Sequence, residues 1–167
     1  HVVEPVDLEG KRVLEVGSGR GGGASYVERE FEPARVDAVD LCENAVSFSQ
    51  ERYGREGLSY HVGDAMSMDF EDSSQDVVVN VESSHRYTDQ ASFFSEVRRV
   101  LRPGGRVLFT DFRDADRVGE MRAEMASQGL EILEERDITS NVVRALELDH
   151  DRKERLIRDK VPLLFRR

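Results

Sequence analysis

Hydrophobic residues along the chain occur in short runs, separated by stretches in which apolar positions have a helical spacing. The runs predict six β-strands, at residues 12–16, 35–40, 58–62, 76–81, 106–112 and 130–138. The stretches between them predict helices at residues 24–31, 43–53, 89–101 and 114–127. Strands that alternate with helices are typical of an α/β fold in which helices cover both faces of a parallel sheet.

The run at residues 76–81 reads Asp-Val-Val-Val-Asn-Val and is almost entirely apolar. A strand of that kind lies in the middle of a parallel sheet, where both of its faces are covered. With 167 residues, the chain fits a single domain over 1–167. Residues 141–167 have an uneven helical pattern and predict a helical tail, which is a candidate homodimer interface.

The charge and cysteine content of the chain indicate which partners to exclude and which cellular compartment to expect. Lys and Arg number 24 against 34 Asp and Glu, which gives a net charge of −10. Broad binding to nucleic acid or to an anionic membrane needs clustered positive charge, so we expect neither partner. The single cysteine, Cys42, excludes an internal disulfide, and we find no apolar run of membrane-spanning length and no secretory leader. We therefore expect a cytoplasmic protein.

Five glycines follow the first predicted strand directly, in the segment Gly17-Ser18-Gly19-Arg20-Gly21-Gly22-Gly23. Without a Cβ, glycine lets the backbone come close to a ligand at the carboxyl end of a doubly wound sheet. The alternative is a flexible turn, which needs fewer glycines. The pattern matches Gly-x-Gly-x-x-Gly and predicts a nucleotide-containing ligand without specifying which one.

Three acidic residues lie at or just after the ends of successive predicted strands and help to specify that ligand. Glu15, two residues before Gly17, repels a pyrophosphate and attracts a sulfonium or ammonium group, which favours S-adenosylmethionine over NAD. Asp40 is placed to accept hydrogen bonds from ribose hydroxyls, which both cofactors carry. Asp64 is placed to accept from the adenine amino group while the Ala65 amide donates to the ring, although Asp64 also fits the capping of a short turn.

Several segments together resemble the class I S-adenosylmethionine-dependent methyltransferases. They are Val-Leu-Glu-Val-Gly-Ser-Gly-Arg-Gly, Val-Asp-Leu-Cys-Glu-Asn-Ala, Val-Gly-Asp-Ala, Asp-Val-Val-Val-Asn-Val-Glu-Ser-Ser-His and Val-Leu-Arg-Pro-Gly-Gly-Arg-Val-Leu. They follow the order of the family over residues 11–138. A closer resemblance, carried by residues 80–87 and the tail, is to small-molecule O-methyltransferases of bacterial polyketide and lipid pathways, such as those that act on phthiotriol.

This resemblance implies a Rossmann-like sheet with strand order 3-2-1-4-5 plus a sixth strand, between two layers of helices. It also implies S-adenosyl-L-methionine as cofactor and no metal ion. Carried over by position, the cofactor-binding residues are Glu15, Gly17, Ser18 and Gly19 around the methionine part, Asp40 and Leu41 at the ribose, Asp64 and Ala65 at the adenine, and Asn80 and Val81 near the amino group.

The chemistry predicted for this site is an in-line displacement, which depends on alignment and on exclusion of water. A hydroxyl acceptor must lose a proton, and a neutral imidazole is suited to take it. His85 is the only histidine in the loop after the fourth predicted strand, so it is the candidate catalytic base. The alternative is a histidine that only orders the loop. Glu82 and Tyr87 flank it, and we interpret both as structural.

Two elements that such methyltransferases usually carry have no counterpart in the pattern, namely a helical lid before the first strand and a seventh strand after the sixth. The apolar segment at residues 163–165 is too short to supply that strand. We expect methyl transfer to a hydroxyl oxygen of a hydrophobic small molecule. Methylation of carbon or nitrogen, a binding module without turnover, and an NAD-dependent oxidoreductase are the alternatives.

Overall fold

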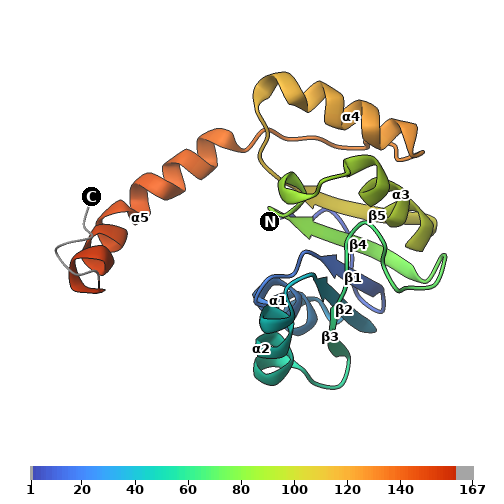
Figure 1. The fold of residues 1–167 in the computed structure, drawn as a ribbon, viewed down its shortest axis with the longest axis horizontal. Coiled ribbons are helices and arrows are strands. Elements are labelled where there is room, and N and C mark those ends of the chain that lie inside the picture. Colours follow the sequence, from blue (N-terminus) through green and yellow to red (C-terminus); the bar gives the residue numbers. More distant parts are fainter. Residues whose placement is uncertain (1, 161–167) are drawn as a thin grey trace. The chain divides into compact units, whose positions relative to one another are not determined.

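In the computed structural model, which describes residues 2–160, five parallel strands form one sheet in the order β3-β2-β1-β4-β5 (Figure 1). The strands are β1 (Arg12–Val16), β2 (Arg35–Asp40), β3 (Leu58–Val62), β4 (Gln75–Val81) and β5 (Leu101–Thr110). This order reverses direction between β1 and β4, where doubly wound sheets bind their ligands. The predicted α/β fold and the order of its first five strands are confirmed.

Helices cover both faces of the sheet (Figure 1). They are α1 (Gly22–Phe31), α2 (Glu43–Tyr53), α3 (Gln90–Val100) and α4 (Val118–Ser127), with single 3₁₀ turns at η1 (Ser84–Arg86) and η2 (Ala115–Arg117). α1 and α2 pack on one face, and α3 and α4 pack on the other. The predicted helices agree with these bounds to within a few residues.

Two apolar cores, one on each face, hold these layers together. Val13 and Val77 face α1 and α2, and the buried Leu8 ahead of β1 joins this core. On the other face, Val78 lies with Phe93 and Phe94 of α3, all three fully buried. Burial of one such side chain contributes about 1.5–3 kcal/mol, so the strand ends that carry the site rest on a rigid base.

The predicted sixth strand is wrong. Residues 130–138 have no regular secondary structure, and Ile132, Leu133 and Ile138 are exposed. Apolar residues in this segment alternate only in part with glutamates. A segment with strand propensity forms a strand only where a neighbouring strand pairs with it.

The prediction for the start of the fifth strand is also revised. β5 begins at Leu101, directly after α3, and Gly104 sits within it at φ +79°. The pairing of β4 with β5 shifts between Gln75 and Val77, so the Arg-Pro-Gly-Gly segment is an irregular strand and not a separate turn. β5 ends at Thr110, which leaves Asp111 and Phe112 in the following loop.

The chain divides into two compact units, one up to Glu131 and one from Ile132 onward. The second contains the helix α5 (Thr139–Lys160), in which no side chain is buried. The helical tail predicted at 141–167 is helical as far as Lys160, and the segment 163–165 lies outside the described residues. None of the helices in residues 2–160 combines the length and the apolar character that crossing a membrane requires.

Candidate active site

The residues predicted to bind the cofactor lie at the carboxyl edge of the sheet, in or directly after four of its strands. Glu15 is in β1 and Asp40 ends β2, while Asp64 follows β3 and Asn80 is in β4. Parallel strands end at the same edge, and this edge is where open α/β sheets bind ligands. The fold therefore brings together residues that are far apart in sequence.

Left-handed backbone and close packing explain two of the glycines in the loop after β1. Gly17 and Gly21 both have φ +75°. A Cβ on Gly17 would run into Ser83 Oγ and lie 2.8 Å from Tyr87 Oη, and one on Gly21 would lie 2.6 Å from the Tyr60 ring. Tyr60 Oη donates a 2.7 Å hydrogen bond to the Gly21 carbonyl. Ser83 and Tyr87 pack against the loop at Gly17, and Tyr60 packs against it at Gly21, so the loop is held in one conformation.

Glu15 has a carboxyl group buried below this loop, beside the first turn of α1. Glu15 is only 8% exposed. Its Oε1 occupies the space that a Cβ on Gly23 would need. Burial raises the pKa of Glu15 to about 7, the charge of Asp40 adds to the rise, and a hydrogen bond from the Ala24 amide opposes it. Glu15 is therefore poised to change its charge near neutral pH.

Buried polar atoms without a hydrogen-bond partner gather at the same place. Residues 2–160 contain four of them, and three lie around the glycine loop, namely Glu15 Oε2, Ser18 Oγ and Asn80 Oδ1; the fourth is Gln75 Oε1. Buried polar atoms are rarely left without partners. Two of these three are acceptors only, which fits a ligand that brings positively charged donors, such as the ammonium group of an amino acid.

Asp40 holds the glycine loop against the end of β2. Its Oδ2 accepts a 2.7 Å hydrogen bond from the Gly19 amide, and its Oδ1 accepts one of 2.9 Å from the Cys42 amide. An ionised carboxylate can accept about four hydrogen bonds, so Asp40 retains capacity for ribose hydroxyls. Leu41 beside it is 71% exposed and offers an apolar surface at the same edge.

Asp64 caps the turn after β3. Its Oδ1 accepts a 2.9 Å hydrogen bond from the Met66 amide, while its backbone carbonyl accepts one from the Ser67 amide. This is the turn-capping geometry that the sequence offered as an alternative. It uses only one carboxylate oxygen, so a role at the adenine remains a prediction, as does that of the buried Ala65.

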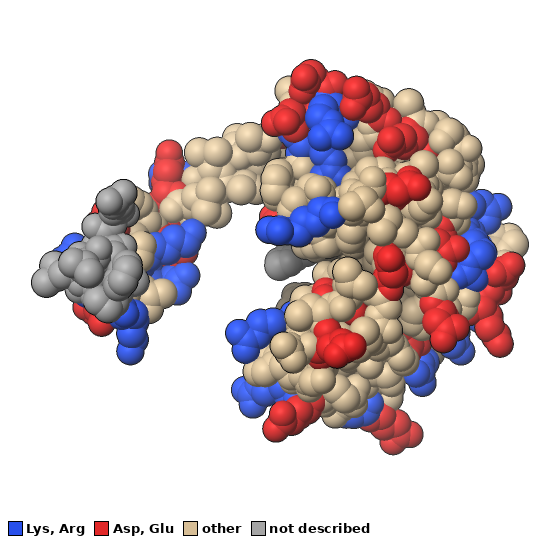
Figure 2. All heavy atoms as spheres, in the orientation of Figure 1, with Lys and Arg blue, Asp and Glu red and all other residues tan. Residues whose placement is uncertain are grey.

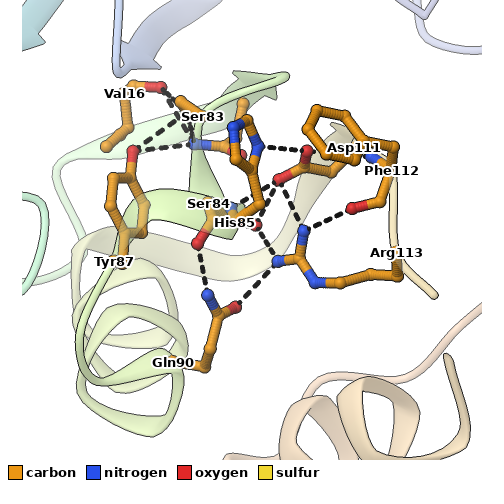
Figure 3. A network of polar contacts seen from close by, with 10 residues as sticks. Val16, Ser83, Ser84, His85, Tyr87, Gln90, Asp111, Phe112 and Arg113 are labelled. Atoms are coloured by element: carbon orange, nitrogen blue, oxygen red, sulfur yellow. Dashed lines mark hydrogen bonds and ion pairs between the residues drawn. The ribbon is translucent and has the colours of Figure 1, made fainter. Parts of the chain in front are cut away.

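Asn80 ties the loop after β4 to the end of β1. Its Nδ2 lies 2.9 Å from the Val16 carbonyl, 2.8 Å from Ser83 Oγ and 3.2 Å from Tyr87 Oη (Figure 3). Tyr87 Oη therefore lies beside Gly17 of the glycine loop, and the structural interpretation of Tyr87 stays a prediction. Val81, the last residue of β4, is 38% exposed.

His85 lies in η1, within the loop after β4. It contacts the carboxylate of Asp111, which the sequence analysis did not identify as a site residue. Its Nδ1 is 2.8 Å from Asp111 Oδ1, and its backbone amide donates to Asp111 Oδ2 (Figure 3). The Phe112 ring lies against the imidazole, with ring centroids 4.2 Å apart. The missed signal was the end of the fifth strand: the prediction placed Asp111 inside residues 106–112, whereas β5 ends at Thr110, so this acid lies beside the loop after the neighbouring β4.

Asp111 determines which imidazole nitrogen carries the proton. Its side chain is fully buried, which raises its pKa, but hydrogen bonds from Ser84 Oγ, the His85 ring and nearby amides outweigh burial, so the pKa of Asp111 is lowered. An ionised carboxylate only accepts hydrogen bonds, so the neutral form of the His85 imidazole carries its proton on Nδ1. Nε2 then has a free lone pair, and no residue in the described part of the chain bonds to it.

The other two histidines within residues 2–160 lie elsewhere. His61, on the edge strand β3, pairs with Asp37 of β2, and His150 pairs with Glu154 on α5. Within residues 2–160, no group of three or more His, Cys, Asp or Glu side chains is arranged to hold a metal ion. Cys42 is exposed and contributes its backbone amide to Asp40.

A profile of the methyltransferase domain family matches residues 14–109, from β1 to β5. The chain belongs to this family. The predicted resemblance to class I S-adenosylmethionine-dependent methyltransferases is thereby confirmed. The match covers most of the sheet and includes Glu15, Asp40, Asp64, Asn80 and His85.

Curated relatives and a solved structure agree with this membership. The chain is 41% identical over 160 residues to a probable phthiotriol/phenolphthiotriol dimycocerosates methyltransferase 2 of Mycobacterium ulcerans, covering 96% of this chain and 62% of the relative. It is 44% identical to a fatty-acid O-methyltransferase of Mycolicibacterium smegmatis, covering 96% and 58%. A phosphoethanolamine N-methyltransferase 2 of Haemonchus contortus, in complex with S-adenosyl-L-methionine, superposes with a TM-score of 0.75 at 26% identity, over 88% of this chain and 39% of that one. The chain thus spans about three fifths of the length of these curated relatives.

Proposed function

We propose that this chain carries the cofactor site and the catalytic base of an S-adenosylmethionine-dependent O-methyltransferase, which acts on a hydroxyl group of a hydrophobic small molecule. The observation that carries the proposal is His85 at the carboxyl edge of the sheet, with Nδ1 bonded to the buried Asp111 and Nε2 free. A histidine held in that way is suited to accept a proton from an acceptor hydroxyl.

The residues around the glycine loop fit the cofactor. The unpartnered acceptors Glu15 Oε2 and Asn80 Oδ1 suit its ammonium group, and Asp40 retains capacity for its ribose hydroxyls. When bound, S-adenosylmethionine supplies a methyl group on a positively charged sulfur. The acidic edge formed by Glu15 and Asp40 favours such a cation electrostatically, whereas it opposes the pyrophosphate of NAD. The acidic edge therefore weighs against an NAD-dependent oxidoreductase.

The side chains next to His85 suit an apolar acceptor. Phe112 is 63% exposed although it lies against the imidazole, and Val81 is exposed at the end of the adjacent strand. Large exposed apolar side chains beside a candidate base indicate a surface that an apolar ligand covers. Two of the relatives are named for lipid-like substrates, a phthiotriol dimycocerosate and a fatty acid.

S-adenosylmethionine, held by the residues around the glycine loop, would supply the methyl group for an in-line displacement by the acceptor oxygen. The proton of the acceptor hydroxyl passes to Nε2 of His85, and the imidazolium that forms is stabilised by the carboxylate of Asp111. His85 then returns the proton to solvent. The loop that holds Asn80, Ser83 and Tyr87 together fixes the position of His85 relative to the glycine loop.

The test is tritiated methyl transfer from S-adenosylmethionine to two probes with the same chain length, 1-hexadecanol and hexadecanoic acid. We expect the protein to methylate the alcohol, and His85→Gln to lower that rate by about 10²–10⁴-fold with unchanged cofactor affinity in calorimetry. A carboxylate is already ionised and needs no base, so transfer to the acid depends little on His85. Cofactor binding without transfer to either probe, or full activity of His85→Gln on the alcohol, contradicts the proposal.

A further inference from the structure

Arg113 is a nearly buried cation beside the candidate base, and the proposed function gives it no role. Only 10% of its side chain is exposed, and it follows β5 two residues after Asp111. One guanidinium nitrogen donates to the Phe112 carbonyl at 2.8 Å and lies 3.1 Å from Asp111 Oδ2. The other donates to Ser84 Oγ at 2.7 Å and to Gln90 Oε1 at 3.2 Å (Figure 3).

The two oxygens of the Asp111 carboxylate have different partners. Oδ1 contacts the imidazole of His85 and accepts from the Phe112 amide, while Oδ2 faces the guanidinium of Arg113 and accepts from Ser84 Oγ and the His85 amide. A buried carboxylate without a counter-charge is unstable. The guanidinium of Arg113 is planar and rigid. Its contact with Oδ2 therefore limits rotation of the whole Asp111 carboxylate, which also fixes the position of Oδ1.

Gln90 fixes Arg113 from the first turn of α3. Its Oε1 accepts from the guanidinium, and its Nε2 donates to the Ser84 carbonyl in η1. The network therefore joins the end of β5, the η1 turn that carries His85, and α3. All three elements belong to the same compact unit.

We propose that Arg113 is a positioning residue, which holds the Asp111 carboxylate so that the His85 imidazole keeps its proton on Nδ1 and presents Nε2 to the acceptor. The catalytic consequence rests on the proposed function, but the effect on the imidazole does not. Without Arg113, the carboxylate loses an orienting contact on Oδ2 and can turn away from the imidazole. Nδ1–H then loses its acceptor, and the Nε2-protonated tautomer of His85 becomes populated.

The direct test is the tautomer of His85 in the ligand-free protein, read from the nitrogen chemical shifts of the ring in ¹⁵N-histidine-labelled protein. The spectrum of His85→Gln assigns its signals among the four histidines. We expect the wild-type protein to carry the proton on Nδ1. In Arg113→Met, which removes the charge and the guanidinium donors and keeps an unbranched apolar side chain, the Nε2-protonated form rises to a population comparable with the Nδ1 form. Arg113→Lys restores the wild-type tautomer in part.

Arg99 provides a matched control. It is an arginine in a comparable network on α3, bonded to Glu96 at 2.7 Å, to Asp72 at 2.8 Å and to the carbonyls of Met68 and Phe70. We expect Arg99→Met to lower stability in thermal unfolding and to leave the His85 signals unchanged. An altered His85 tautomer in Arg99→Met would assign the effect to general loosening of the fold and overturn the proposal.

The remaining outcomes separate this proposal from the proposed function. Unchanged His85 signals in Arg113→Met overturn the positioning role. If Arg113→Met does not fold, Arg113→Lys carries the same test, because it keeps the charge but loses the fork of donors. With 1-hexadecanol as acceptor, kcat of Arg113→Met falls by about ten- to a hundredfold and cofactor affinity stays constant. A tautomer change in a protein that transfers no methyl group refutes the proposed function alone.

Discussion

Glu15, beside the glycine loop, has a carboxyl group whose ionised form is disfavoured by burial. Its carboxyl group is buried, one of its oxygens lacks a partner, and its pKa rises to about 7, mainly through burial. In the unfolded chain the same group has a pKa near 4.5. Ionisation of Glu15 therefore opposes folding in the ligand-free protein, and a bound cation relieves that cost.

We expect Glu15→Gln to stabilise the ligand-free protein in a pH-dependent way. Below pH 4.5 the folded and unfolded states both hold the proton, so ionisation costs nothing. Between pH 4.5 and 7 the wild-type protein loses stability as pH rises, and above pH 7 the full cost applies. The rise of the Glu15 pKa from 4.5 to about 7 sets an upper limit of about 3–4 kcal/mol on this cost.

Urea unfolding at pH 5 and at pH 8 measures this effect. The gain in unfolding free energy from Glu15→Gln should be small at pH 5 and largest at pH 8. The control is Glu30→Gln, at a half-exposed position on α1. Equal stability of Glu15→Gln and wild type at pH 8 would contradict the prediction. In calorimetry the Glu15 variant should bind S-adenosylmethionine more weakly, because the cation loses its acidic partner.

At the scale of elements, the glycine loop and the loop after β4 are packed against each other. Gly17 contacts Ser83 and Tyr87, and these two hydroxyls lie 3.0 Å apart. We expect Gly17→Ala to destabilise the protein by about 1–3 kcal/mol, because the new methyl group meets Ser83 and the backbone has φ +75°. The displaced loop should also weaken cofactor binding.

Gly22→Ala is the matched control for this substitution. Gly22 is the first residue of α1, its φ is not left-handed, and a Cβ there has open space around it. Alanine favours helix over glycine by up to about 1 kcal/mol, so this variant should be neutral or slightly more stable. Thermal unfolding together with calorimetric titration of S-adenosylmethionine compares the two. Equal effects of the two substitutions would refute the role of the Gly17–Ser83 contact.

The elements that could be predicted are those whose sequence pattern agrees with their surroundings. β1, β2 and β3 have their predicted bounds because apolar runs end at glycines or acids. Residues 130–138 have an apolar pattern but no neighbouring strand, so the pattern failed there. Asp111 was assigned to the interior of a strand, and its role at His85 became visible only when the end of β5 was known.

The whole molecule consists of two units, and only the first carries candidate site residues. Acidic and basic side chains are interspersed over its visible face (Figure 2). On α5, ion pairs such as Arg144–Glu147 and Lys153–Asp149 are exposed, and each contributes little to stability. Isolated helices are marginal in water, and Val142, Val143 and Leu146 of α5 are exposed, so we expect α5 to be stabilised by association.

Ending the chain at Glu131 tests this division. The first unit has its own two apolar cores and all of the candidate site, so we expect the shortened chain to retain its unfolding midpoint and its affinity for S-adenosylmethionine. If the tail is a homodimer interface, as its pattern predicts, the full chain sediments as a dimer and the shortened chain as a monomer. Leu146→Glu in the full chain should then give a monomer without a change in cofactor affinity. A loss of cofactor affinity on shortening would instead show that the second unit contributes to the site.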